Sequence, residues 1–121
     1  MTTNHPILVV DDDPSILDTV TEILTFEGYA VETARNGQEA LRCIEQVLPS
    51  LVLLDMRMPV LDGWGLVRQL QQQGLVLPIL VMTAAQDARR WAQEVGADGY
   101  LAKPFDLTEL LTSVENMLLQ S

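Results

Sequence analysis

The side chains best suited to chemistry in this sequence stand directly after short apolar stretches. Three consecutive carboxylates, Asp11 to Asp13, follow one such stretch, and Asp55 follows another. Thr83 and Lys103, the only lysine in the chain, follow two more. A carboxylate at the end of a buried stretch is costly unless something at that place requires its charge. These residues are therefore the candidates for a functional site.

Carboxylates that are pressed together raise each other's pKa unless a cation joins them. Mg²⁺ suits such a group, since it takes one or two carboxylates together with water and phosphate oxygens. Asp11, Asp12 and Asp55 would supply a site of this kind and leave positions open for a ligand. Asp13 is better placed to cap a helix, because Pro14 stands at the first helical position.

The two remaining candidates suit a phosphoryl group. Lys103 can act as a compact positive charge for a phosphoryl oxygen or for Asp55. The hydroxyl group of Thr83 can donate a hydrogen bond to such an oxygen. Alone, either residue could be an ordinary residue at a strand end. Together with the carboxylates they match phosphoryl transfer to an aspartate, with Asp55 as the nucleophile.

The sequence predicts alternating strands and helices, and these elements would position the candidate residues. Short aliphatic runs predict five strands near residues 7–10, 29–34, 51–55, 78–82 and 99–102. Apolar residues at helical spacing predict helices within residues 16–24, 40–48, 66–70, 88–95 and 107–118. This alternation indicates an α/β fold with a doubly wound parallel sheet and helices on both faces. All the strands then end at the same rim, where the candidates should meet.

Two helices and one strand carry more detailed expectations. The second strand is the most polar and is expected at an edge of the sheet. The second helix is expected to include Val47 and Leu48 in its apolar face. The first helix is expected to bury a face made of Ile16, Val20, Ile23 and Leu24.

Length and composition narrow the class of protein. The 121 residues are enough for one domain, spanning residues 1–121. The formal net charge of −10 argues against nucleic-acid binding, which needs a basic surface. The single cysteine, Cys43, permits no internal disulfide. Neither a signal peptide nor a membrane-spanning stretch is evident, so a cytoplasmic protein without membrane contact is expected.

The motifs at the strand ends resemble those of the receiver domains of bacterial two-component response regulators. The matching stretches run in family order through residues 7–14, 54–59, 62–63, 81–84, 96–98 and 100–105. The resemblance implies a flavodoxin-like sheet of five parallel strands in the order 2-1-3-4-5, which periodicity alone does not give. It implies a phosphoacceptor switch rather than an enzyme, with Asp55 phosphorylated by a histidine kinase or a phosphotransfer protein.

The resemblance also implies how a metal ion is bound. Asp12, Asp55 and the backbone carbonyl of Arg57 would hold Mg²⁺, and Asp11 would act mostly through water. The residue type at position 57 varies within the family, and in this sequence it is a cation, Arg57. We expect this side chain to reach over the site and to change the lifetime of the acyl phosphate.

The same resemblance implies a conformational switch. Lys103 and Thr83 would contact the phosphoryl group, and the peptide bond before Pro104 would be cis. Thr83 would move toward the phosphoryl group while Tyr100 turns inward. The surface of the fourth helix, fifth strand and fifth helix would change with them and bind a downstream protein.

Several alternatives remain open at this point. A phosphohydrolase of the haloacid dehalogenase type also uses an aspartate nucleophile, although residues 11–15 fit its motif poorly. An unphosphorylated adaptor with the same fold would not need all of these polar residues, and a flavin protein would need a phosphate-binding loop after the first strand. The receiver could be a stand-alone regulator or a part of a larger one.

The two tryptophans each have two interpretations. Trp64 follows the turn at Asp62 and Gly63, so its fluorescence could report Mg²⁺ binding, or it could pack at the rim of the third helix. Trp91 could form a partner contact together with the neighbouring arginines, or it could face the core.

Overall fold

Five strands alternate with five helices along the chain, as the sequence predicts. The computed structural model describes residues 5–119. The elements are β1 (Ile7–Val10), α1 (Pro14–Phe26), β2 (Val31–Ala34), α2 (Gly37–Gln46), β3 (Leu51–Asp55), α3 (Gly63–Gln72), β4 (Ile79–Ala84), α4 (Ala85–Val95), β5 (Gly99–Lys103) and α5 (Leu107–Leu119).

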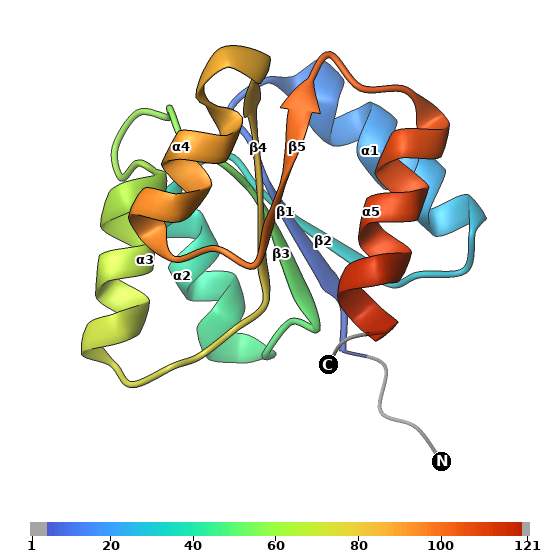
Figure 1. Cartoon of the computed structure of the whole chain (residues 1–121). Helices are drawn as coiled ribbons and strands as arrows, with labels where there is room; N and C mark the ends of the chain where they lie inside the picture. Colours follow the sequence, from blue (N-terminus) through green and yellow to red (C-terminus); the bar gives the residue numbers. More distant parts are fainter. Residues whose placement is uncertain (1–4, 120–121) are drawn as a thin grey trace.

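The five strands form one parallel sheet in the order β2-β1-β3-β4-β5, which confirms the flavodoxin-like order. Helices α1 and α5 cover one face of the sheet, and α2, α3 and α4 cover the other (Figure 1). Strands β1 and β3 are buried along their whole length, which explains their uninterrupted aliphatic sequences. The more polar β2 lies at an edge, as expected, and exposes Glu32 and Thr33.

The helices bury slightly different residues from those expected. In α1 the buried positions are Leu17, Val20 and Leu24, while Ile16 and Ile23 are only partly buried at the margin of the core. The predicted buried face included Ile16 instead of Leu17. Apolar residues cover a broad stripe of this helix, so the sequence alone does not show which of them are most buried. Helix α2 ends at Gln46, and the two residues expected to extend it, Val47 and Leu48, are about half exposed.

Strands β4 and β5 extend further than the sequence indicated. Thr83 pairs with Ala102, and Ala84 pairs with Lys103, so that Thr83 lies inside β4 and Lys103 is the last residue of β5. The additional pairing carries both side chains to the carboxyl ends of the strands. This rim is the upper end of the sheet in Figure 1.

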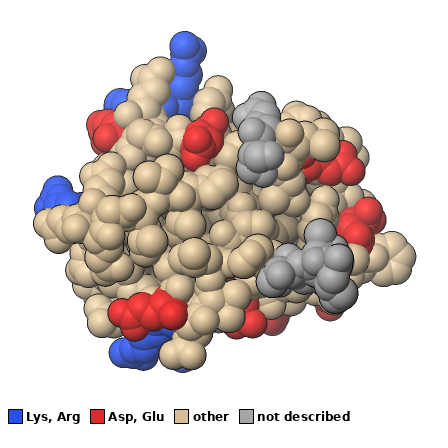
Figure 2. Space-filling view, turned by 90° about the horizontal axis from the view of Figure 1, so that it is seen from below, with Lys and Arg blue, Asp and Glu red and all other residues tan. Residues whose placement is uncertain are grey.

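The opposite end of the sheet has a different character. Figure 2 shows this face, and in its described part the charged side chains lie mostly around the margin. Among residues 5–119, no helix has both the length and the apolar character needed to cross a membrane. The predicted cluster of carboxylates lies at the other end of the sheet, where β1 and β3 end.

Candidate functional site

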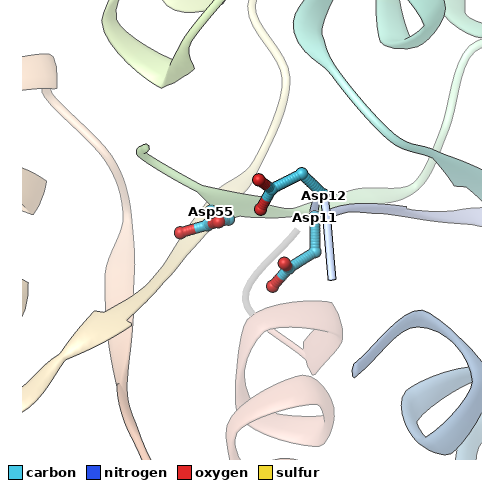
Figure 3. Close-up of side chains that lie close together, drawn as sticks. All are labelled: Asp11, Asp12 and Asp55. Carbon is cyan, nitrogen blue, oxygen red and sulfur yellow. The ribbon is translucent and has the colours of Figure 1, made fainter. Parts of the chain in front are cut away.

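Three carboxylates converge where β1 and β3 end (Figure 3). Asp11, Asp12 and Asp55 each offer an oxygen atom, and these oxygens all lie within 4.8 Å of one another. Asp11 and Asp55 are buried, whereas Asp12 is exposed. The arrangement leaves the cluster open to solvent on the side of Asp12.

The chain leaving β1 holds the first of these carboxylates in place. The amide of Asp11 donates to the carbonyl of Ala34 at 3.1 Å, which continues the pairing with β2. The carboxylate of Asp11 accepts a hydrogen bond from the amide of Asp13 at 2.9 Å. Asp13 in turn caps α1, because its side chain accepts from the amide of Ser15. The expectation that Asp13 is a helix cap is therefore confirmed.

Lys103 brings a positive charge to the same place from β5. Its Nζ lies 2.7 Å from Oδ2 of Asp11 and 3.8 Å from Oδ1 of Asp55. The short contact is thus with Asp11, whereas the sequence favoured Asp55 or a phosphoryl oxygen. The Lys103–Pro104 peptide bond is cis in the structure.

The crowding changes the acidity of Asp55. Burial, followed by the neighbouring charge of Asp11, raises the pKa of the Asp55 carboxyl to about 6, although Lys103 acts in the opposite direction. The Asp55 carboxylate is ionised at neutral pH, although burial and the nearby charge of Asp11 make its negative charge unfavourable. A bound cation would relieve that penalty.

The remaining predicted residues lie on the two neighbouring strands. Thr83 is buried, with only 5% of its surface exposed, and it lies one position beyond Met82, the partner of Asp55 in the register. Tyr100 on β5 is 48% exposed and so is directed away from the core. The structure thus brings Thr83 to the rim with the carboxylates and leaves Tyr100 on the outer surface.

A tightly held loop connects Asp55 to α3. The amide of Gly63 donates to the carbonyl of Met56 at 3.0 Å and closes the loop at its base. Within it, the amide of Leu61 donates to the carbonyl of Pro59 at 2.8 Å, and Val60 has a φ of 70°. A branched residue in this three-residue turn is strained, which indicates that the surrounding contacts impose the conformation.

The side chain of Arg57 does not extend across the carboxylates as expected. Its guanidinium carbon lies 5.0 Å from the centre of the Trp91 ring, on α4. Trp91 is buried, with 5% of its surface exposed, in agreement with the core-facing alternative. Trp64 contacts the same ring edge-to-face at 4.9 Å and donates from Nε1 to Glu94 at 3.1 Å. The packing interpretation of Trp64 therefore holds, and its response to Mg²⁺ stays a prediction.

The chemistry of the donor set fits a hard divalent cation. Three carboxylates supply oxygen atoms only, and Mg²⁺ and Ca²⁺ both prefer oxygen. The single cysteine, Cys43, lies on α2, outside the site. Asp11, Asp12 and Asp55 could together hold such an ion, and Lys103 would remain available beside it.

Comparison with known proteins identifies the family. The family model described as the response regulator receiver domain matches residues 7–115. The chain belongs to the response regulator receiver family. Response regulator MprA of Mycolicibacterium vanbaalenii is 46% identical over 114 residues, which make up 93% of this chain and 49% of that protein. The receiver domain therefore spans about half the length of the curated relatives that it matches.

Solved structures agree with this assignment. The receiver domain of NtrX from Brucella abortus is 34% identical, with a TM-score of 0.86, over 95% of this chain and 99% of that one. The chemotaxis protein CheY4 of Vibrio cholerae is 33% identical, with a TM-score of 0.85, over 96% of this chain and 100% of that one. Membership of this family is consistent with a role in phosphorelay signalling.

Two contacts at this site were not anticipated from the sequence. The ion pair between Lys103 and Asp11 joins residues 92 positions apart, and the stacking of Arg57 on Trp91 joins a loop to a different helix. The sequence does not specify either pair, because both depend on how side chains are oriented after the strands have been assembled. The lone lysine was the only clue to the first contact.

Proposed function

We propose that this receiver domain, comprising residues 1–121, accepts a phosphoryl group on Asp55 from a histidine kinase or a phosphotransfer protein. The observation that carries the proposal is the convergence of three carboxylates with the single lysine at one rim of the sheet. Membership of the receiver family supports the same function.

In this proposal, Asp55 is the nucleophile. Its pKa of about 6 leaves the carboxylate ionised at neutral pH, so that no general base is required. A carboxylate oxygen bonds to phosphorus while the bond from phosphorus to the donor's imidazole nitrogen breaks. The imidazole keeps the electron pair of that bond and takes up a proton. Lys103 and Thr83 then contact the phosphoryl oxygens.

The proposed metal ligands are Asp12, Asp55 and the backbone carbonyl of Arg57, with Asp11 acting through water. When bound, Mg²⁺ neutralises negative charge on the phosphoryl oxygens. Asp11 already holds Lys103 at 2.7 Å, which fixes the ammonium beside the acceptor carboxylate. Asp11 is thus a positioning residue as well as a member of the metal site.

The proposed output is a change in the surface formed by α4, β5 and α5. Thr83 lies in β4, directly before α4, and Tyr100 is exposed on the adjacent β5. A new dianion at Asp55 would favour an arrangement in which Thr83 moves toward the phosphoryl group and Tyr100 turns inward. A downstream protein would bind one of these arrangements more tightly than the other.

The proposal is tested by weighing the intact chain after incubation with Mg²⁺ and acetyl phosphate. We expect one added phosphoryl group in the native protein and none in Asp55→Asn or in the presence of a chelator. Asp18→Asn, which removes an exposed carboxylate from α1, should leave the added mass unchanged. No phosphoryl mass under any of these conditions would instead support an unphosphorylated adaptor.

A further inference from the structure

Arg57 carries a guanidinium group close in sequence to the proposed phosphoacceptor. It stands two positions after Asp55, and two residues span at most about 7 Å of chain. In the structure the guanidinium lies over Trp91, with its carbon 5.0 Å from the ring centre. Among residues 5–119, no carboxylate lies within ion-pair distance of it. The aromatic face is thus the main partner of this cation.

The tryptophan is held far more firmly than the arginine. Trp91 is 5% exposed and belongs to the core, and the ring of Trp64 packs edge-to-face against it at 69°. Arg57 is exposed and stands in the loop between β3 and α3. Any rearrangement of this pair would therefore move the arginine and leave the ring in place.

A second arginine near the same ring is engaged differently. Arg90 lies 6.0 Å from the centre of the Trp91 ring, but its guanidinium also pairs with Asp87 at 2.8 Å on the same helix. Arg90 belongs to α4, whereas Arg57 belongs to the loop that leaves Asp55. The two arginines thus provide a test residue and a matched control beside one aromatic ring.

We propose that Arg57 exchanges partners when Asp55 is phosphorylated, leaving the face of Trp91 and binding a phosphoryl oxygen. This inference rests on the proposed function, because it requires a phosphoryl group at Asp55. A guanidinium binds phosphate oxygens through charge-assisted, bidentate hydrogen bonds, which are stronger than the stacking of a solvent-exposed arginine on an aromatic ring. The appearance of the dianion therefore reverses the preference of the side chain.

The exchange couples the site to α4. Trp91 loses its contact with Arg57 when Asp55 gains a phosphoryl group, so the change at the acceptor reaches this helix directly. Coupling of this kind is reciprocal. The contact between Arg57 and Trp91 must therefore weaken binding of the phosphoryl group by the same free energy by which the phosphoryl group weakens that contact. Trp91 is then a positioning residue that holds Arg57 away from the acceptor.

Fluorescence of Trp91 tests the movement. In a Trp64→Phe background Trp91 is the only tryptophan, and Mg²⁺ with beryllofluoride supplies a stable analogue of the phosphoryl group. We expect the analogue to change the emission of Trp91, and we expect Arg57→Gln to abolish that change. Arg90→Gln removes an equal charge near the same ring and should preserve it. A change of equal size in Arg57→Gln would overturn the proposal.

Affinity for beryllofluoride, followed by ¹⁹F NMR, tests the reciprocity. Arg57→Gln should weaken binding by roughly threefold to tenfold, the range for a charge-assisted contact at a partly exposed site. Trp91→Phe offers a weaker face to the cation and should strengthen binding by about twofold. In the Arg57→Gln background, Trp91→Phe should have no effect. A purely structural role of Trp91 would give the same change in both backgrounds and would overturn the proposal.

The ¹⁹F signal also separates this inference from the proposed function. Native protein that gives no bound signal with Mg²⁺ would overturn both. A bound signal together with unchanged affinity in Arg57→Gln would overturn the partner exchange alone and leave Asp55 as the phosphoacceptor.

Discussion

The ion pair between Lys103 and Asp11 affects both the stability of the protein and the proposed chemistry of the site. Asp11 is fully buried, and the ammonium at 2.7 Å is the cation that compensates its charge. Removing one partner of a buried ion pair leaves the other charged and desolvated. The lysine therefore has a role in stability as well as the proposed role in phosphoryl transfer.

We predict that Lys103→Met destabilises the metal-free protein at pH 7 by about 1–3 kcal/mol, because Asp11 loses its cation while the side chain of Lys103 is only partly buried. Urea unfolding measures the change. Adding Mg²⁺ should recover part of the loss. Arg68→Met, at an exposed position of α3, is the control. Equal stabilities for the two variants would contradict the assigned role of Lys103.

The raised pKa of Asp55 predicts an unusual dependence on pH. The carboxyl has a pKa of about 6 in the folded chain and an ordinary value of 3.8. Between these values the folded state holds a proton that the unfolded state has lost. The stabilisation by this proton is fully present below pH 3.8 and is lost as the pH rises through about 6.

We predict that Asp55→Asn removes this part of the pH dependence. Because a shift of about two units corresponds to roughly 3 kcal/mol at most, the variant should be about 1–3 kcal/mol more stable than the native chain at pH 7 without metal. Denaturant unfolding between pH 4 and pH 8 measures both effects. Asp18→Asn should keep the native profile. An Asp55→Asn variant with unchanged stability at pH 7 would refute the raised pKa.

At the scale of elements, the loop between β3 and α3 carries strain. Val60 is 79% exposed and has a φ of 70°, a conformation that glycine adopts without penalty. We predict that Val60→Gly raises stability by about 1 kcal/mol, because relief of strain exceeds the added entropy of the unfolded chain. Thermal unfolding is the measurement. Val76→Gly, at a 95% exposed valine whose φ is not positive, should stabilise nothing.

The start of α3 is held close to the chain that leaves the site. A Cβ atom at Gly63 would lie 2.9 Å from the Cα of Met56, directly after Asp55. A Cβ atom at Gly65 would instead meet the flexible end of Leu61, whose Cδ1 is 2.5 Å away. The first clash requires the backbone to move, and the second requires only a side-chain rotation.

We predict that Gly63→Ala lowers stability by about 1–3 kcal/mol, as overpacking does, despite the better helix propensity of alanine. Gly65→Ala has the same gain in propensity and should cost clearly less. Chemical denaturation of the pair gives the difference. Displacement of Met56 should also weaken Mg²⁺ binding in Gly63→Ala only. Equal losses in the two variants would show that the approach to Met56 is not a constraint.

The helices and strands also show how much of the fold could be predicted from the sequence. The five strands, the five helices and the meeting of Asp55 with Lys103 at one rim follow from periodicity and from the geometry of parallel sheets. The strand order required the resemblance to a family, because periodicity does not distinguish neighbouring strands. Leu17 was missed because α1 buries a broad stripe, and the partner of Arg57 because it lies on a different element.

At the scale of the whole molecule, the fold brings together carboxylates that are far apart in the sequence. The chain has a net charge of −10, and three of its carboxylates meet at the ends of β1 and β3. We predict that Mg²⁺ raises the melting temperature of the native protein and that Asp12→Asn reduces this gain, because a ligand of the folded state stabilises it. Asp106→Asn, outside the cluster, should leave the gain intact. An equal gain in Asp12→Asn would exclude Asp12 as a ligand.

The most direct test of the account is to locate the phosphoryl group on the chain. After reaction with Mg²⁺ and acetyl phosphate, borohydride reduces an aspartyl phosphate to homoserine, and peptide mass spectrometry reports its position. We predict homoserine at position 55, with Asp11 and Asp12 unmodified. Homoserine at position 11 or 12, or a phosphate that survives on a serine or threonine, would contradict it.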